Sequence, residues 1–243
     1  MKLKVLGCGD AFGSEGRFNT SFLLQDDQYN VLVDCGASTL IKLKHHKISP
    51  ESIDLIVITH FHGDHYGGIP FIVISNKIEY QRSRPLIIVG PEGIKEKTYQ
   101  LQEALYPGTS DLLEEIGVEF YEYNDTFSEV LAGIEVRGLK VTHAPPSNPH
   151  GVQLKIGGKL FGFSGDTEWD DNLIELAEST DLFILECNNL TKDSPGHIGF
   201  ETVMLKKSLL KTKRLFLTHM GSEMIAQPDL AVERLQENLE IDF

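Results

Sequence analysis

The sequence predicts an α/β protein in which two β-sheets pack face to face and helices cover their outer surfaces. Two features lead to this prediction. Short apolar runs of strand length recur in both halves of the chain, and segments of helical period lie between them. An apolar sheet face must be buried against a second layer, so two such halves favour a layered sandwich. Because no linker separates the halves, we expect residues 1–243 to form a single domain.

The predicted elements follow the apolar pattern along the chain. Strand-length runs occur at Leu3–Leu6, Ser21–Leu24, Val31–Val33, Leu55–Thr59, Leu86–Val89, Val118–Tyr121, Ile134–Val141, Val152–Ile156, Lys159–Phe163, Leu182–Leu185 and Arg214–Thr218. Helical patterns occur at Thr39–His46, Tyr66–Ile78, Gly93–Leu105, Asp170–Glu178, Gly199–Lys211 and Pro228–Leu239. The pair Gly157-Gly158, between two strand-length runs, predicts a hairpin turn.

The composition is that of a globular protein with an acidic surface. The 243 residues are 41% hydrophobic and 24% charged, which excludes a disordered or low-complexity chain. A net charge of −14 disfavours a broad nucleic-acid-binding surface, because such surfaces depend on Lys and Arg. The basic residues Lys206, Lys207, Lys211, Lys213 and Arg214 gather near the end of a predicted helix. Positive charge there complements the helix dipole.

Cysteine content points to a reduced compartment, and the lack of long apolar stretches points to a protein that does not enter a membrane. Cys8, Cys35 and Cys187 are odd in number and far apart, so they do not form a disulfide framework. The N-terminus has too few apolar residues for a signal peptide. The longest apolar stretch, Ile69–Ile74, is far short of the ~20 residues that span a bilayer. We therefore expect a cytoplasmic protein with no membrane partner.

The strongest motif is H-x-H-x-D-H, at the end of a predicted strand. It places His60, His62, Asp64 and His65 within six positions. Imidazole and carboxylate groups are the ligands that borderline divalent metals prefer. Because side chains alternate in an extended turn, His60 and His62 project together, while Asp64 and His65 can face a second point nearby. The motif therefore predicts two adjacent metal ions.

Three further residues follow predicted strands. His143 comes after Ile134–Val141, Asp166 after Lys159–Phe163, and His219 after Arg214–Thr218. The carboxyl ends of strands are where α/β folds tend to place their ligand sites. Each residue alone would be a weak signal. Together with the motif, all three are expected to converge on one site.

The order of these residues resembles the metallo-β-lactamase superfamily. The pattern is H-x-H-x-D-H, a later His143, Asp166 within S-G-D-T, and His219 within L-T-H. The similarity extends over nearly the whole chain, from Leu6-Gly7-Cys8-Gly9 onward. It implies an αββα four-layer sandwich, with two mixed sheets flanked by helices and a dinuclear metal site at one edge.

The resemblance also implies a division of the ligands. One ion would be held by His60, His62 and His143, the other by Asp64, His65 and His219, with Asp166 bridging both. Asp34, in V-D-C-G, would orient the ligands from outside. Zinc is the expected metal for nitrogen and oxygen ligands, with manganese as the alternative. The intact Asp64-His65 pair argues against the oxygen-reducing diiron members and leaves hydrolases, whose metals activate a bound water.

Within the superfamily, the chain resembles the ribonuclease Z-like branch, which also contains small phosphodiesterases. The resemblance lies in Gly7-Cys8-Gly9, in Arg17–Ser21, and in Glu186 followed by His197. In that branch the histidine protonates the leaving oxygen and the glutamate orients it. Asp64, Glu186 and His197 are therefore the expected catalytic set. The usual Ser or Thr does not follow His197, which leaves a loop or helix-cap role as the alternative.

The predicted substrate is small. Only 22 residues separate His143 from Asp166, where ribonuclease Z carries a long tRNA-binding arm. This spacing and the acidic charge favour a cyclic or small nucleotide, or an alkyl phosphodiester, over a nucleic acid. The loop Pro145–Pro149 either shapes a pocket beside the site or is a stiff surface loop.

Several alternatives remain open. These are tRNA 3′-end cleavage with an arm supplied by a partner, a thioesterase or lactonase with the same ligands, and a metal-binding module without activity. A dinucleotide-binding fold is excluded, because Gly7-Cys8-Gly9 continues to Gly13 with the wrong spacing. The expected partner is a small phosphodiester substrate. The protein is either a monomer or a homodimer, and the sequence does not decide between them.

Overall fold

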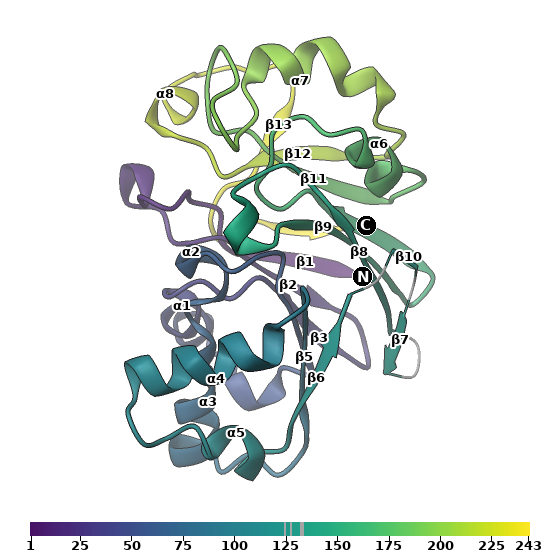
Figure 1. Ribbon diagram of the computed structural model, residues 1–243. Coiled ribbons are helices and arrows are strands. Elements are labelled where there is room, and N and C mark those ends of the chain that lie inside the picture. The colour runs from purple at the N-terminus through teal and green to yellow at the C-terminus, as the bar shows by residue number, and fades with distance from the viewer. Residues whose placement is uncertain (124, 127, 132–133) are drawn as a thin grey trace.

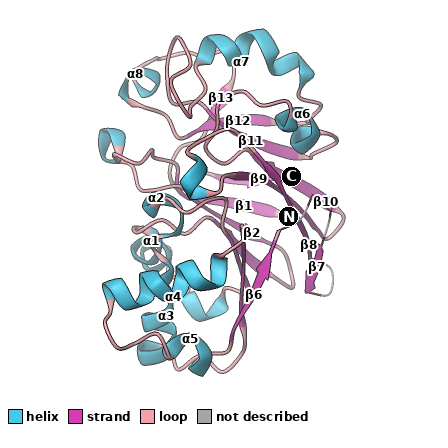
Figure 2. Cartoon of the chain, in the orientation of Figure 1, coloured by secondary structure: helices cyan, strands magenta, loops and turns pink. Residues whose placement is uncertain are grey.

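The computed structural model describes residues 1–123, 125–126, 128–131 and 134–243, and these form two seven-stranded sheets that pack face to face. Helices cover the outer surface of each sheet, and the two chain ends lie close together (Figure 1). Colouring by secondary structure shows the four layers as helix, sheet, sheet and helix (Figure 2). The predicted αββα sandwich is therefore confirmed.

The first sheet belongs mainly to the N-terminal half. Its strands, in spatial order, are β14 (Glu240–Asp242), β1 (Lys2–Gly7), β2 (Ser21–Gln25), β3 (Asn30–Val33), β4 (Leu55–Val57), β5 (Leu86–Gly90) and β6 (Val118–Glu122). Its helices are α1 (Thr39–His45), α2 (Gly63–Tyr66), α3 (Ile69–Ile74), α4 (Ile94–Leu105) and α5 (Leu112–Glu115). Pairing is antiparallel from β14 to β3 and parallel from β3 to β6.

The second sheet repeats this arrangement. Its strands are β13 (Glu233–Arg234), β12 (Leu215–Thr218), β11 (Leu182–Glu186), β10 (Lys159–Phe163), β9 (His150–Ile156), β8 (Ile134–Lys140) and β7 (Ser128–Leu131). Its helices are α6 (Asn172–Ala177), α7 (Phe200–Lys206) and α8 (Ser222–Ile225). Pairing is antiparallel from β7 to β10 and parallel from β10 to β13. The two halves thus share one pairing pattern.

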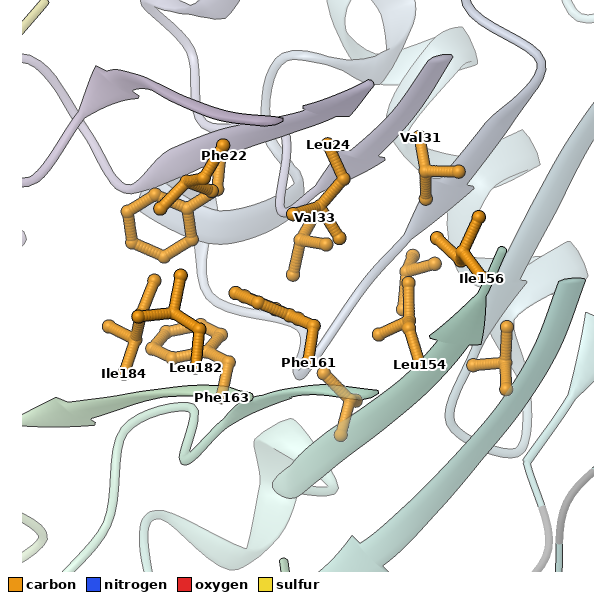
Figure 3. Packing of buried hydrophobic residues seen from close by; sticks show 14 of the residues in the cluster. Phe22, Leu24, Val31, Val33, Leu154, Ile156, Phe161, Phe163, Leu182 and Ile184 are labelled. Atoms are coloured by element: carbon orange, nitrogen blue, oxygen red, sulfur yellow. The ribbon is translucent and has the colours of Figure 1, made fainter. Parts of the chain in front are cut away.

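The strands are apolar on both faces because both faces are covered. Along β4, Leu55 and Val57 lie in the core between the sheets, whereas Ile56 packs beneath the helices. Between the sheets, side chains from β2 and β3 meet side chains from β9, β10 and β11 (Figure 3). Among them, Phe22 and Phe163 pack edge to face, with ring centroids 5.2 Å apart. Such two-sided burial explains the continuous apolar runs of the parallel strands.

The helix predicted at Pro228–Leu239 is wrong. The structure has only the short strand β13 there, flanked by turns. Leu235 lies in the core between the sheets, and its amide donates to the Leu217 carbonyl at 2.8 Å, beside β12. Val232 packs instead beneath the outer helices. The apolar residues of this segment therefore face opposite sides of the sheet, which a single helical stripe cannot do.

Other boundaries differ less. The helix predicted at Tyr66–Ile78 is divided into α2, α3 and a π-helical turn at Ser75–Glu79. It breaks at Gly67-Gly68, where a Cβ on Gly68 would lie 2.2 Å from the Gly36 carbonyl oxygen. The helix predicted at Gly199–Lys211 ends earlier, as α7 and a 3₁₀ turn.

Other features agree with the predictions or add to them. Strands β7, β13 and β14 were not predicted. The hairpin at Gly157-Gly158 is present, and both glycines have positive φ. Within the described part of the chain, no helix has the length and apolar character needed to cross a membrane.

Candidate metal centre

The H-x-H-x-D-H segment forms the turn after β4 and the start of α2. His60 and His62 precede the helix in a connecting loop, whereas Asp64 and His65 belong to its single turn. His60 and His65 are completely buried. The loop is anchored by its backbone, since the Phe61 amide donates to the Ser147 carbonyl at 2.9 Å. The motif residues therefore have fixed positions at the edge of the sandwich that α2 marks in Figure 1.

The other three predicted ligands reach the same edge from the second sheet. His143 follows β8, Asp166 follows β10 and His219 follows β12. Since β8 and β10 are both antiparallel to β9, and β10 to β12 are parallel, these three strands end at one edge. Asp166 and His219 are buried. The structure thus brings all seven residues together, as the strand-end argument predicted.

These residues form two clusters that share Asp166. The histidine cluster comprises His60, His62, His143 and Asp166, and the aspartate cluster comprises Asp64, His65, His219 and Asp166. In the histidine cluster, Nδ1 of His62 lies 3.1 Å from Nε2 of both His60 and His143. In the aspartate cluster, Oδ2 of Asp166 lies 3.3 Å from Nε2 of His65 and 3.2 Å from Nε2 of His219.

The donor atoms fit divalent ions. Around a tetrahedral zinc ion with bonds of about 2.0–2.1 Å, ligand atoms lie about 3.3 Å apart, close to the observed spacings. Nε2 of His65 and Oδ1 of Asp166 are buried and have no hydrogen-bond partner among the described residues. Leaving such atoms unpaired costs free energy, and both belong to residues of the aspartate cluster, which favours a cation there. Both donor sets contain the nitrogen and oxygen ligands that zinc accepts.

The two clusters differ in charge. In the histidine cluster, burial lowers the pKa of His60 well below its usual range and lowers the pKa of His143. In the aspartate cluster, burial opposes protonation of His65 and His219, but nearby carboxylates outweigh it. They raise the pKa of His65 well above its usual range and that of His219 to about 9. The imidazoles of the histidine cluster are therefore neutral ligands even without metal.

Asp34 supports the aspartate cluster from outside, as the resemblance implied. Its carboxylate is completely buried and accepts a hydrogen bond from Nδ1 of His65 at 2.6 Å. It also accepts the Thr59 amide at 2.8 Å and the Thr59 hydroxyl at 2.9 Å. These contacts fix the His65 ring so that Nε2 points into the cluster.

Glu186 and His197 lie beside both clusters. Glu186 ends β11 and is fully buried, and its Oε1 accepts hydrogen bonds from Nδ1 of His197 at 2.9 Å and from the Thr167 amide at 3.1 Å. The His197 ring stacks on His219 and meets His143 edge to face, with centroids 5.4 and 5.0 Å apart. Burial disfavours charge on His197, but the hydrogen bond to Glu186 and the charges of Glu186 and Asp166 together outweigh it and raise the His197 pKa.

Two supporting groups were not foreseen from the sequence. The Thr59 hydroxyl, which donates a hydrogen bond to Asp34, also lies 3.0 Å from Nδ1 of His60. The Gly196 carbonyl accepts Nδ1 of His143 at 2.8 Å. Thr59 directly precedes the motif and could have been suspected for that reason, whereas a backbone carbonyl leaves no sequence signal. The loop Pro145–Pro149 anchors Phe61 through Ser147, and Pro145 and Pro149 line a hollow beside His143.

Family comparisons agree with this geometry. The family described as anti-Pycsar protein Apyc1 matches residues 1–233. The chain belongs to the Apyc1 family. An Apyc1 from Bacillus phage 010DV004 is 26% identical, over 92% of this chain and 90% of that protein. A ribonuclease Z from Staphylococcus carnosus is 33% identical, over 100% of this chain and 97% of that protein.

Solved structures show the same fold as this Apyc1 family member. The short form of human tRNase Z has a TM-score of 0.79 at 20% identity and covers 100% of this chain and 99% of its own. The metallo-β-lactamase fold protein YhfI of Bacillus subtilis has a TM-score of 0.77 at 21% identity, covering 99% of each chain. The predicted superfamily and its ribonuclease Z-like branch are thus confirmed. The protein is a metal-dependent hydrolase.

Proposed function

We propose that this protein is a phosphodiesterase that hydrolyses a cyclic or small nucleotide, or an alkyl phosphodiester, at two divalent metal ions. The observation that carries the proposal is the pairing of His197 with the buried Glu186 next to both ligand clusters. Cleavage of a phosphodiester leaves an alkoxide that needs a proton, and a paired histidine is a suitable donor. A thioester releases a thiolate, which departs more readily and would make less use of such a donor placed beside the metals.

The ions would be held by His60, His62 and His143 on one side, by Asp64, His65 and His219 on the other, and by Asp166 between them. Zinc is the proposed metal, with manganese as the alternative because Asp64 and Asp166 supply oxygen ligands. When bound, the ions lower the pKa of water and polarise the phosphoryl group. Asp64, buried next to His65 and His219, is held as a carboxylate, since these histidines keep its pKa low despite burial.

His197 is proposed to hold and deliver the proton. Its Nδ1 is engaged by Glu186, so Nε2 is the nitrogen left to face a substrate. The Glu186 carboxylate favours the charged imidazolium and fixes the plane of the ring. His197 is 23% exposed in its side chain, whereas Glu186 is completely buried. A substrate can therefore reach the proton donor, His197, but not the group that orients it, Glu186.

A small substrate is supported by the connection between His143 and Asp166. Its 22 residues contain the turn Pro145–Ser147 and the hairpin of β9 and β10, with no inserted arm. The alignment with the Staphylococcus ribonuclease Z extends over 308 positions, although this chain has 243 residues. That relative therefore carries insertions that this chain lacks. The relatives named ribonuclease Z keep tRNA 3′-end cleavage as the second candidate.

The experiment compares two leaving groups in the metal-loaded protein. General acid catalysis contributes roughly 10²–10⁴-fold where the departing oxygen needs a proton. His197→Ala should lower turnover of a cyclic nucleotide by about that factor, but only mildly affect bis-p-nitrophenyl phosphate, whose leaving group departs unaided. Metal content, measured by elemental analysis, should not change. His45→Ala, which removes an exposed histidine of α1, is the control.

Three outcomes would contradict the proposal. An equal loss on both phosphodiesters would show that His197 positions substrate and does not donate a proton. Turnover of thioesters or lactones without phosphodiester cleavage would assign the site to another ester class. Cleavage of precursor tRNA, together with salt-dependent retardation of tRNA on a gel, would favour the second candidate.

A further inference from the structure

The turn that carries His197 is held by the Gly196 backbone on both of its sides. Ser194 and His197 exchange two backbone hydrogen bonds, of 3.1 and 2.9 Å, which close the turn. The Gly196 carbonyl accepts Nδ1–H of His143 at 2.8 Å. The Gly196 amide donates to Oε1 of Glu168 at 2.9 Å. One residue of the turn therefore connects a candidate metal ligand with a carboxylate outside both clusters.

Glu168 is itself tied to the strand end that bears His143. It lies two residues after Asp166, and its own amide donates to the Thr142 carbonyl at 2.7 Å. The Thr142 amide in turn donates to the hydroxyl of Thr167 at 3.1 Å. The Glu168 carboxylate thus projects from a backbone that is fixed relative to His143. A hydrogen bond from an amide to a carboxylate is stronger than one to a neutral acceptor.

Position 196 has no side chain that could hold the turn by packing. Gly196 has a φ of +84°, which favours glycine, and a Cβ there would lie 2.6 Å from Nδ1 of His143. The contact between His143 and the turn therefore depends on the position of the backbone. In the described ranges of the chain, the Glu168 carboxylate is the one side-chain group that accepts a hydrogen bond from the Gly196 amide.

We propose that Glu168 is a positioning residue that, through Gly196, sets the geometry of both His143 and His197. By holding the turn, it orients the His143 ring so that Nε2 faces the histidine cluster. The same contact fixes where His197 stands relative to that cluster. The part concerning His197 rests on the proposed function, whereas the part concerning His143 needs only metal binding.

Glu168→Ala and Glu168→Gln, in the full chain, test this role. In Glu168→Ala, zinc affinity measured by competition with a chromophoric chelator should fall about 10–100-fold at one of two sites, as for other groups that support a metal ligand. Turnover of a cyclic nucleotide should fall at least about 10-fold in kcat with little change in KM, because a misplaced catalytic group loses rate. Hydrolysis of bis-p-nitrophenyl phosphate should change less, since its leaving group needs no proton.

The remaining variants distinguish a positioning role of Glu168 from an effect of its charge and from an effect on folding. Glu168→Gln keeps an acceptor oxygen at the same reach, although a weaker one, and should recover most of both readouts relative to Glu168→Ala. Glu168→Asp keeps the charge but withdraws the carboxylate by one methylene, and should behave like Glu168→Ala. Glu178→Ala removes an exposed glutamate after α6 and should have no effect on either readout. If Glu168→Ala does not fold, a defective Glu168→Asp beside an active Glu168→Gln supports the proposal.

Two results would overturn the proposal. One is unchanged zinc affinity and unchanged leaving-group dependence in both Glu168→Ala and Glu168→Asp. The other is a Glu168→Gln variant as defective as Glu168→Ala, since the carboxylate would then act through its charge. If the native protein cleaves neither phosphodiester, the proposed function fails, but zinc affinity still decides whether Glu168 supports His143.

Discussion

The histidine cluster and the aspartate cluster share Asp166 but are supported in different ways. In the aspartate cluster, Nδ1 of His65 donates to the buried carboxylate of Asp34 at 2.6 Å. In the histidine cluster, Nδ1 of His143 donates to a peptide carbonyl, that of Gly196, at 2.8 Å. A buried carboxylate raises the basicity of its histidine more than a neutral carbonyl does. The two sites should therefore differ in affinity and in their response to pH.

The clusters also draw differently on the two halves of the fold. The aspartate cluster takes Asp64 and His65 from one turn of α2, whereas the histidine cluster takes His60 and His62 from the loop before it. Each cluster is then completed by residues from the second sheet. Correct packing of the two sheets is thus a condition for both sites, and neither half could form a site by itself.

The largest expected effect comes from removing the residue that the clusters share. Asp166→Ala should abolish detectable hydrolysis and reduce metal content from about two ions per chain, because each cluster loses a ligand. Elemental analysis after dialysis and a hydrolysis assay would measure this. Asp171→Ala, an exposed aspartate five residues on, should leave both unchanged. Full metal content in Asp166→Ala would show that the clusters are independent.

Site residues that are close together in the sequence could be predicted from the sequence alone, whereas distant ones needed the predicted strands. His60, His62, Asp64 and His65 are close together in sequence, so the motif can be recognised without the fold. The expected pairs, His60 with His62 and Asp64 with His65, agree with the two clusters. The extended turn expected there was wrong for the second pair, because Asp64 and His65 lie in the helical turn α2. His143, Asp166 and His219 are far apart in the chain. They were found because parallel strands end at one edge, and that rule needs only the strands to be recognised.

What could not be predicted depends on tertiary contacts. The segment Pro228–Leu239 has helical spacing, but Leu235 and Val232 enter different layers of the sandwich. Tertiary packing therefore overrides local periodicity there. The Gly196 carbonyl is a backbone group that no residue type announces, and Glu168 reaches it only because two strand ends meet.

A smaller effect, centred on one cluster, is expected from Asp34→Asn. The amide keeps the shape of the carboxylate but is a weaker partner for His65, so affinity should fall about 10–100-fold at the aspartate cluster. The histidine cluster, which Asp34 reaches only through the Thr59 hydroxyl, should weaken less. Zinc titration against a chelator should then show two sites that are weakened unequally. Asp10→Asn is the control, since the Asp10 carboxylate is also buried but, within the described part of the chain, accepts hydrogen bonds from the Ser14 amide and hydroxyl. Equal weakening of both sites would mean that Asp34 supports the whole centre.

The smallest effect is a difference in proton release. A metal ion binds neutral imidazole, so a histidine that is protonated beforehand must lose its proton. Because the pKa of His219 is raised to about 9, it carries a proton at pH 7.5, as does His65, whose pKa is also raised. The pKa values of His60 and His143 are lowered, so these rings carry none. The aspartate cluster should therefore release about two protons per ion, and the histidine cluster almost none.

This difference also fixes the sign of the pH dependence. Affinity at the aspartate cluster should decrease as the pH falls below 9, about tenfold per pH unit for each proton released, while affinity at the histidine cluster stays constant from pH 7 to 9. Calorimetry in buffers of different ionisation enthalpy measures the protons released. His62→Ala and His219→Ala each leave one cluster intact and so separate the two ions. Equal proton release in the two variants would contradict the charge difference between the clusters, whatever their affinities.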